Sequence, residues 1–321
     1  MRILVTGGAG FIGSHLCERL VSDGHTVTAI DNFSTGRAAN LANLNNSENF
    51  TLIQGSILDT EILKPLIDGN DYVFHLAAAV GVFNIVNNPL ASLLTNIRGT
   101  ENVLEAAHVT KTPVFLTSSS EVYGKNISDS LKESDDRILG SPVTLRWSYS
   151  EAKAIDESLA YAYFIEKQLE TRIVRFFNTV GPRQLGAYGM VVPRFIKAAL
   201  ADEPITIYGD GNQTRCFAHV YDVVDAVMAI AFTDNTIGKV INIGNNFEIS
   251  INGLAKKIIE ETSSKSEIVY VPYEEAYGDG FEDMERRVPN IDLINQLVDW
   301  KPKRDLSTMI ADISVEMKKG S

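Results

Sequence analysis

A tyrosine and a lysine stand four residues apart in the segment RWSYSEAK, which begins at Arg146. On a helix, residues i and i+4 share one face, so Tyr149 and Lys153 would be neighbours there. A positive charge beside a phenol favours the phenolate and lowers the phenol pKa from its usual value of about 10. Such a pair could take a proton from a substrate hydroxyl, but the same spacing also arises by chance. The interpretation depends on whether a cofactor and a cleft lie beside the pair.

A glycine-rich segment, GGAGFIGSHL, follows the first apolar run and places Gly7, Gly10 and Gly13 three residues apart. Glycines there allow a tight turn and let the backbone approach a pyrophosphate, which would lie at the N-terminus of the next helix. The second apolar run ends at Asp31, where a carboxylate can bind a ribose 2′-hydroxyl. Because this carboxylate would repel a 2′-phosphate, the sequence favours NAD over NADP, although Arg37 lies nearby.

Small and hydroxyl residues follow two later apolar runs, in HLAAAVG from His75 and in TSSSEVYG at 117–124. Ligands of open α/β sheets bind at the carboxyl ends of the strands, so both segments could face a cofactor. Ser119 would then share a hydrogen bond with Tyr149. With the nicotinamide cation close by, the pKa of Tyr149 would fall toward neutrality, and the phenolate could accept a proton while a hydride leaves. Serines after a strand are also typical of turns and helix caps.

The elements that would position these residues alternate between strands and helices. Continuous apolar strands separated by amphipathic helices predict a Rossmann-type, doubly wound parallel α/β sheet. From residue 181 onward, glycine- and proline-punctuated turns separate shorter elements, so we expect an NAD-binding domain at 1–178 and a smaller second domain at 179–321, to which the resemblance described below assigns the binding of a sugar nucleotide. Segments within 214–244 are expected to return to the first domain. Predicted strands are 3–6, 27–30, 51–54, 72–76, 114–117, 172–176 and 240–243, and predicted helices are 11–22, 90–108, 150–167 and 219–231.

Composition narrows the class of protein. The chain has 321 residues, of which 45% are hydrophobic and 22% charged, with a net charge of −12. This balance is typical of a globular protein and argues against non-specific binding to nucleic acid or to an anionic membrane. No apolar stretch is long enough for a membrane span, and Cys17 and Cys216 have no metal-ligand spacing. We therefore expect a cytoplasmic protein without a metal site, in which His75, His108 and His219 have structural or solvent roles.

Taken together, GGAGFIG, HLAA, SSSEVYG, Tyr149-x-x-x-Lys153, FFNTVGPR and QTRCF resemble the extended short-chain dehydrogenase/reductase family of nucleotide-sugar epimerases, dehydratases and decarboxylases. The resemblance covers nearly the whole chain and implies an NAD that is reduced and reoxidised within each turnover. It implies Tyr149 as the base, Lys153 as its partner and Ser119 as the hydroxyl of the triad. Ser56 departs from the family, which usually has an aspartate there to contact adenine. The implied cofactor contacts are Gly7, Gly10, Phe11, Ile12, Gly13, Asp31, Asn32, Ser34, Gly36, Ser56, Ile57, Leu76, Ala77, Ala78, Asn96, Thr117, Tyr149 and Lys153.

The resemblance also implies a UDP-sugar substrate. Asn178 matches a residue at the diphosphate, and Arg215 and Arg287 match arginines that hold the diphosphate or a charged end of the sugar, as a planar guanidinium can. For Arg194 we expect a surface salt bridge instead. The implied substrate contacts are Ser119, Ser120, Glu121, Asn178, Arg183, Val192, Tyr208, Arg215 and Arg287.

Two reactions remain open after oxidation at carbon 4 of the sugar. Return of the hydride to the other face would make a 4-epimerase acting on UDP-glucuronate or UDP-glucose, which FFNTVGPRQLGAYGMVVPRF narrowly favours. Loss of carbon dioxide from a 5-carboxylate would make a UDP-glucuronate decarboxylase. Glu121 matches the catalytic carboxylate of decarboxylases and dehydratases. A non-catalytic NAD sensor would typically lack Tyr149 or Lys153.

The resemblance implies a homodimer as well, because helices 90–108 and 150–167 match those that pair across a two-fold axis in the family. Both segments carry apolar positions beyond one core-facing stripe.

Overall fold

A seven-stranded parallel sheet forms the centre of the larger lobe in this computed structural model, which describes residues 1–81, 85, 87–186, 190–272, 275, 284 and 286–319. The strand order is β11-β6-β5-β4-β1-β2-β3, so the predicted Rossmann-type sheet is confirmed. Its strands are β1 (Arg2–Thr6), β2 (Thr26–Asp31), β3 (Phe50–Gln54), β4 (Tyr72–His75), β5 (Val114–Ser119), β6 (Thr171–Phe176) and β11 (Val240–Ile243).

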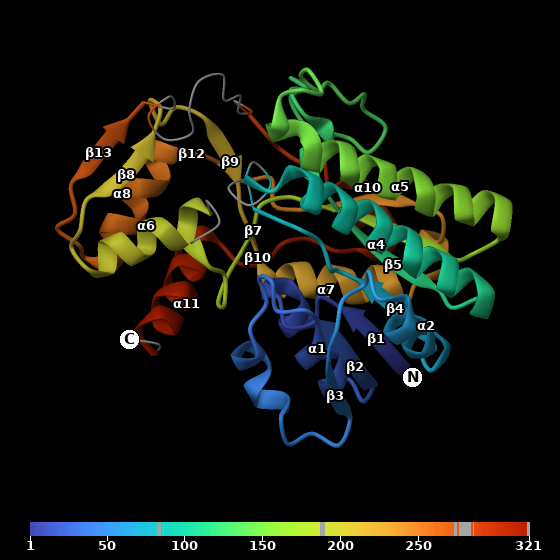
Figure 1. Cartoon of the computed structure of the whole chain (residues 1–321). Coiled ribbons are helices and arrows are strands. Elements are labelled where there is room, and N and C mark those ends of the chain that lie inside the picture. The colour runs from blue at the N-terminus through green and yellow to red at the C-terminus, as the bar shows by residue number, and fades with distance from the viewer. Residues whose placement is uncertain are drawn as a thin grey trace.

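Helices cover both faces of this sheet (Figure 1). On one face α1 (Phe11–Ser22), α7 (Val220–Ala231) and α10 (Asp292–Val298) pack over inward residues such as Ile3 and Val5. On the other face α2 (Thr60–Asp68), α4 (Pro89–Thr110) and α5 (Ser148–Lys167) pack over Leu4. Side chains of successive strand residues point to opposite faces, which is why buried parallel strands read as continuous apolar runs.

Strands β1 and β4 are neighbours in the sheet, although β2 and β3 separate them in the sequence. The chain runs outward from β1 through β2 to β3 and then crosses back to β4. At such a change of direction, a crevice opens beyond the carboxyl ends of the two strands. The glycine turn after β1 and the small residues after β4 therefore lie at the same edge.

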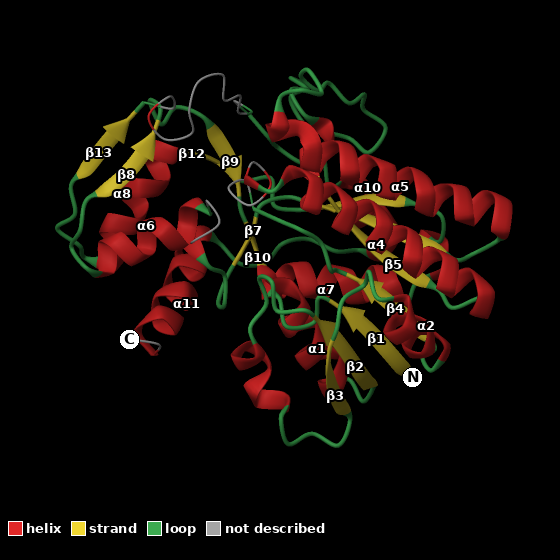
Figure 2. Ribbon diagram, viewed as in Figure 1, coloured by secondary structure: helices red, strands yellow, loops and turns green. Residues whose placement is uncertain are grey.

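The smaller lobe combines helices with short strands (Figure 2) and has its own apolar core. Helices α6 (Val191–Leu200), α8 (Ile251–Thr262) and α11 (Leu306–Lys319) pack with the parallel pair β8 (Ile205–Tyr208) and β13 (Ile268–Val271). Two short pairs, β7 (Thr179–Val180) with β10 (Ala218–His219) and β9 (Thr214–Cys216) with β12 (Glu248–Ser250), complete this part.

The chain passes between the lobes more than once. Strand β11 pairs with β6, and α7 packs in the same core as α1, so both belong to the larger lobe. Ile294 of α10 and Trp300 also enter that core, which the sequence did not indicate. Segments that follow Asn178 thus contribute to the larger lobe, and a boundary between two domains near Asn178 stays a proposal.

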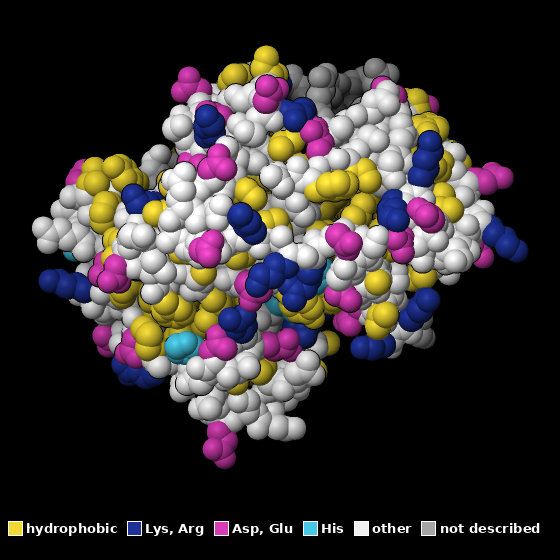
Figure 3. Space-filling view, turned by 180° about the vertical axis from the view of Figure 1, so that it is seen from behind, with side chains coloured by type: hydrophobic (Ala, Val, Ile, Leu, Met, Phe, Trp, Pro, Cys, Tyr) yellow, Lys and Arg dark blue, Asp and Glu magenta, His cyan; other side chains and the backbone are white. Residues whose placement is uncertain are grey.

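Neither the surface charge nor the composition of the helices points to a particular kind of partner. On the face in Figure 3, lysine and arginine side chains are interspersed with aspartate and glutamate, so no one sign of charge covers that face. None of the helices in the described ranges has the length and apolar character needed to cross a bilayer.

Candidate active site

A pocket of about 700 Å³ lies at the carboxyl edge of the sheet and extends to the smaller lobe. This volume is within the range of small-molecule and cofactor sites. Both the glycine turn and the Tyr149–Lys153 pair line it, so the pair does lie in a cleft beside a candidate nucleotide site.

The glycine turn fits a pyrophosphate because side chains are excluded from it. Gly7 has a φ of +71°, and a Cβ there would lie 2.8 Å from the Ala77 nitrogen. A Cβ on Gly13 would lie 2.2 Å from the Gly7 carbonyl oxygen. Helix α1 begins after Gly10, which supplies no side-chain cap, so the N–H groups of its first turn face the pocket mouth without a competing side chain.

Asp31 is fixed at the end of β2 by backbone donors. Its Oδ2 accepts a hydrogen bond from the Ala9 nitrogen at 2.9 Å, and its Oδ1 accepts one from the Phe33 nitrogen at 2.8 Å. Each carboxylate oxygen keeps a further lone pair, and Asp31 lines the pocket. The glycine turn and Asp31 therefore fit the diphosphate and ribose of an NAD.

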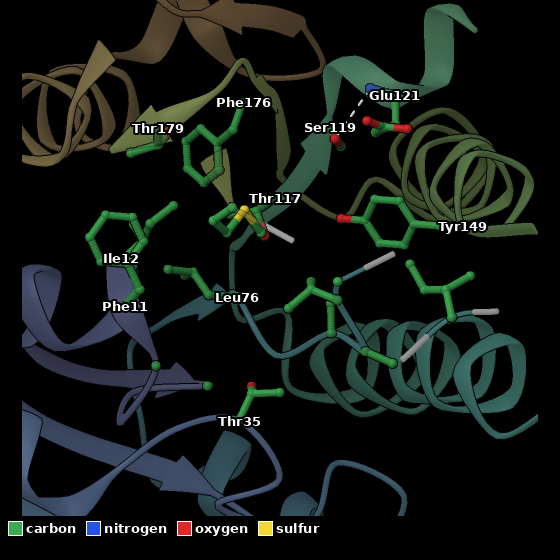
Figure 4. A pocket seen from close by; sticks show the side chains of 18 of the residues that line it. Phe11, Ile12, Thr35, Leu76, Thr117, Ser119, Glu121, Tyr149, Phe176 and Thr179 are labelled. Carbon is green, nitrogen blue, oxygen red and sulfur yellow. Dashed lines mark hydrogen bonds between the residues drawn. The ribbon is translucent and has the colours of Figure 1, made fainter. Parts of the chain in front are cut away.

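Tyr149 projects from α5 into the pocket toward the end of β5 (Figure 4). Burial raises the pKa of its phenol; Lys153 and the Ser119 hydroxyl counteract this, and Glu121 and Asp156 add to it. Lys153 alone therefore does not bring the phenol to neutrality. The rest of the lowering expected from the sequence would have to come from a cofactor cation.

Lys153 is held by two acceptors beneath Tyr149. Its Nζ donates to the Thr117 carbonyl oxygen and to Asp156 Oδ2, each at 3.1 Å. An ammonium group has three N–H bonds, so one is left for the pocket, which Lys153 lines. Burial lowers the pKa of Lys153, but Asp156 and Tyr149 outweigh burial and raise it above its ordinary value.

Ser119 ends β5, and the 3₁₀ turn η2 (Ser120–Tyr123) follows it. The Ser119 hydroxyl oxygen accepts a hydrogen bond from the Glu121 nitrogen at 3.2 Å, drawn in Figure 4. Its own proton stays available to a substrate oxygen. The same turn aims the Glu121 carboxylate along the pocket wall.

A buried ion-pair cluster surrounds Glu121. Arg146 donates to Glu121 Oε2 at 2.6 Å, and Arg287 donates to Oε1 at 2.5 Å. Arg287 also donates to Asn178 Oδ1 at 2.9 Å. Burial would raise the pKa of Glu121, but the two guanidinium groups lower it far below its usual range. Glu121 is consequently ionised, and charge-assisted bonds fix its position.

The smaller lobe supplies the opposite wall with Val192, Tyr208 and Arg215, all predicted from the sequence to contact the substrate. Arg194 also lines the pocket, and its guanidinium lies 4.1 Å from the centre of the Tyr208 ring. It donates to the Thr206 carbonyl oxygen at 3.1 Å. The expected surface salt bridge for Arg194 is therefore replaced by stacking on an aromatic ring.

Three of the predicted site residues do not line the pocket: Gly36, Asn96 and Arg183. Gly36 packs against the Asp31 carboxylate, because a Cβ added to Gly36 would lie 2.8 Å from Asp31 Oδ2. Asn96 bonds the backbone of Ala79. Arg183 reaches α1, where it donates to Glu18 Oε1 at 2.7 Å. Their predicted direct contacts with ligand stay predictions.

The remaining predicted residues do line it, and two arginines join them that the sequence analysis did not place in the site, Arg146 and Arg194. Arg146 stands three residues before Tyr149, so a search of the residues around the tyrosine for charge could have found it. Among the described residues, no three His, Cys, Asp or Glu side chains come together in a way that could hold a metal ion.

Comparisons with known proteins agree with this geometry. The model of the family described as GDP-mannose 4,6 dehydratase matches residues 4–313. A UDP-N-acetyl-alpha-D-glucosaminuronate decarboxylase of Bacillus cytotoxicus is 43% identical over 302 residues, covering 94% of this chain and 92% of that protein. UDP-glucuronic acid decarboxylase 1 of Xenopus tropicalis is 37% identical, covering 94% and 68%.

A solved structure is similar over its whole length. It is a UDP-glucuronic acid 4-epimerase from Bacillus cereus in complex with UDP-glucuronic acid and NAD, and its identity to this chain is 30%. The TM-score is 0.90, and each chain is covered completely.

Proposed function

The chain belongs to the family of NAD-dependent nucleotide-sugar epimerases, dehydratases and decarboxylases, and we propose that it decarboxylates a UDP-linked hexuronic acid. UDP-N-acetylglucosaminuronate and UDP-glucuronate are the two substrates to test. The observation that carries the proposal is the ionised Glu121 carboxylate between Arg146 and Arg287, beside Ser119 and Tyr149. The sequence alone favoured epimerisation narrowly, whereas the similarity to decarboxylases along 94% of the chain supports decarboxylation.

The first step is removal of the proton from the carbon 4 hydroxyl. Tyr149 takes it, Ser119 donates a hydrogen bond to the same oxygen, and Lys153 stabilises the phenolate. When bound, NAD supplies the acceptor for the hydride of carbon 4. The position of Tyr149 on α5 and of Ser119 at the end of β5, both lining the pocket in Figure 4, supports a shared hydrogen bond to one substrate oxygen.

The resulting 4-ketone makes the 5-carboxylate a β-keto acid. The bond between carbon 5 and the carboxylate breaks, carbon dioxide leaves, and the electron pair passes to the carbon 4 oxygen. The Tyr149 hydroxyl stabilises the negative charge on that oxygen, and carbon 5 then takes up a proton from water. Return of the hydride to carbon 4 would follow, with Tyr149 giving its proton back to the carbon 4 oxygen, so that the cofactor would end the turnover oxidised. Such stabilisation by a positioned donor is a large part of catalysis in enclosed sites.

The cluster at Glu121 is suited to orient the carboxylate of the substrate. Arg146 and Arg287 can each bind a carboxylate, and Glu121 keeps both guanidinium groups at fixed positions. A negative carboxylate near that of the substrate would also favour the departure of carbon dioxide, because departure removes the repulsion between them.

A 4-epimerase is the second candidate. Its support is the Bacillus cereus epimerase, which is similar over the whole chain at 30% identity. An epimerase must let the keto sugar turn in the pocket, whereas a decarboxylase must hold its carboxylate still. The ion pairs of Glu121 favour the second behaviour.

The experiment is incubation with each UDP-hexuronate, followed by chromatography and mass measurement of the products. We expect loss of carbon dioxide from at least one substrate. Glu121→Gln should lower carbon dioxide release about tenfold or more, the lower end of the usual effect of a positioned catalytic group, while a transient signal of reduced cofactor persists. Glu105→Gln, in an exposed residue of α4, is the control. A product of unchanged mass and altered stereochemistry would establish the epimerase instead.

A further inference from the structure

Asp156 is a buried carboxylate that the reaction above does not use. It lies on α5 three residues after Lys153, and its side chain is completely buried. Its Oδ2 lies 3.1 Å from Lys153 Nζ, whose side chain is 3% exposed. Placing a carboxylate in such an environment has a large desolvation cost, so the surrounding polar groups must hold it in place.

A chain of buried polar groups leads from Asp156 to the edge of the cofactor pocket. Burial raises the pKa of Asp156, and Lys153 and the Thr100 hydroxyl of α4 counteract this. His75 Nε2 lies 3.2 Å from the Thr100 hydroxyl oxygen, and His75 Nδ1 lies 2.8 Å from that of Thr6. The Ala77 nitrogen in turn donates to the Thr6 hydroxyl oxygen at 3.1 Å.

The donors in this chain have only one consistent direction. An ionised carboxylate only accepts, so Thr100 donates to Asp156 and accepts from His75 Nε2–H. His75 Nδ1 then accepts from the Thr6 hydroxyl, which accepts from the Ala77 N–H. His75 must be neutral in this arrangement, and burial does lower its pKa, to about 3. The chain thus points its protons toward Asp156, whose Oδ2 accepts the bond from Lys153 and whose Oδ1 has no hydrogen-bond partner among the described residues.

We propose that Asp156 is a positioning residue that keeps Lys153 charged and oriented, and that holds Tyr149 in its protonated form until a further positive charge enters the pocket. The negative charge of Asp156 partly offsets the effect of Lys153 on the phenol. In the reduced-cofactor stage, where the nicotinamide carries no positive charge, Tyr149 then keeps the proton it has taken. The inference rests on the acid–base role proposed for Tyr149, and it is independent of the identity of the sugar.

Other titratable groups lie around Tyr149 and Lys153, and their effects can be distinguished from that of Asp156. Glu157 lies next to Asp156 on α5, but Arg175 of β6 binds both of its carboxylate oxygens, at 2.9 and 2.7 Å. Glu121 faces Tyr149 from η2, and Arg146 and Arg287 pair with it. His75 faces Lys153 from β4 and is neutral. Asp156 is the carboxylate paired with Lys153 itself.

The test is a spectroscopic titration of Tyr149 in the NAD-loaded protein without substrate. Tyrosinate absorbance is recorded against pH, and the same titration with Tyr149→Phe added to each background identifies the signal of this one tyrosine. Asp156→Asn should lower the titration midpoint of Tyr149 by about one unit, the usual effect of removing a nearby charge. Glu157→Gln, a neighbouring buried carboxylate, is the matched control and should shift it by less than half as much. An unchanged or raised midpoint in Asp156→Asn overturns the proposal.

A second comparison covers the case in which Asp156→Asn does not fold. Lys153→Met leaves Asp156 without its cation and should raise the Tyr149 midpoint, and adding Asp156→Asn to Lys153→Met should bring it down again. Equal midpoints for these two proteins would also overturn the proposal. Because no substrate is present, failure to decarboxylate a given sugar leaves this titration unaffected, so the two proposals fail separately.

Discussion

The glycine turn after β1 and the ion-pair cluster around Glu121 line the same pocket, but backbone groups form the first and charged side chains form the second. The turn lies within one short segment and presents backbone N–H groups, and its shape follows from missing side chains at Gly7 and Gly13. The cluster joins side chains from three segments, and Glu121 and Arg287 are 166 residues apart. A site of the first kind depends on local geometry, whereas one of the second kind depends on how the two lobes pack.

Tyr149 stands between these two regions, and its removal should have the largest effect. Tyr149→Phe keeps the ring but removes the proton acceptor, so turnover should fall about a hundredfold or more, while NAD and substrate still bind. Turnover and bound nicotinamide are measured on the same preparation. Tyr161→Phe, in an exposed tyrosine of the same helix, is the control and should retain normal turnover. Near-normal activity of Tyr149→Phe would remove the basis of the mechanism.

Gly13→Ala tests the region that depends on backbone geometry. The added Cβ would lie 2.2 Å from the Gly7 carbonyl oxygen, so the turn must move away from α1. We expect a loss of about 1–3 kcal/mol in the free energy of unfolding, the usual cost of overpacking, and loss of the NAD that we expect to copurify with the unchanged protein. Denaturant unfolding and nicotinamide analysis measure the two effects.

The control for this change is Gly69→Ala at the C-terminal end of α2, outside the pocket. A Cβ there would approach one carbonyl oxygen at 3.2 Å, and φ is an ordinary −75°. This variant should keep its NAD. A Gly13→Ala protein that retains NAD as well as the control does would show that the turn is less constrained than its geometry indicates.

The contrast between the two regions also explains what the sequence could predict. Residues 11–22 read as a helix from their amphipathic pattern and their glycine turn, and the structure has α1 over Phe11–Ser22. Asp31 follows from its place at the end of a strand. Both depend on interactions within a few residues, for which sequence periods and caps are reliable indicators.

The partners of Arg146 and Arg194 could not be predicted in the same way. Arg146 faces Glu121 only because the turn after β5 and the start of α5 meet in the fold. Arg194 stacks on Tyr208 because α6 lies against β8. The guanidinium of Arg183 donates to Glu18 of α1, a partner that the sequence did not indicate, and its predicted contact with the substrate stays a prediction. Tertiary packing determines which group a long flexible side chain contacts, so the spacing of residues in the sequence does not predict its partner.

A pH experiment distinguishes the buried His75 of β4 from the Glu121 cluster, because the two groups titrate in different pH ranges. Burial lowers the pKa of His75 from 6.5 to about 3, so the unfolded chain binds a proton there that the folded protein does not. Stability from this source is complete above pH 6.5 and falls as the pH decreases below it. Between pH 6.5 and 5 the loss is up to about 2 kcal/mol. His75→Gln should remove this part of the slope in denaturant titrations.

Glu121→Gln, in the ion-pair cluster, is the variant to compare with His75→Gln. The arginines lower the pKa of Glu121, so its stabilising contribution is present above about pH 4.5 and is lost only as the pH falls further. This variant should therefore leave the slope between pH 6.5 and 5 as in the wild type. If both variants change that slope equally, His75 is not the source of the acid sensitivity in this range.

The smallest effect on the chemistry is expected at the outer surface of α4 and α5, which lie side by side in Figure 1. Leu90 and Val109 of α4 are 68% and 79% exposed, and Tyr161 and Ile165, one turn apart on α5, are 48% and 55% exposed. We predict that these apolar side chains are covered in a homodimer related by a two-fold axis, as the resemblance implies.

Ile165→Glu would place charges against each other in that interface and should shift the protein to a particle of 35.3 kDa. Turnover should change by less than about threefold, because the substitution does not touch the pocket. Val315→Glu, at an exposed apolar residue of α11 in the smaller lobe, should remain dimeric. Light scattering at micromolar concentration measures both, and a wild-type particle of monomer mass would show that these helices do not pair.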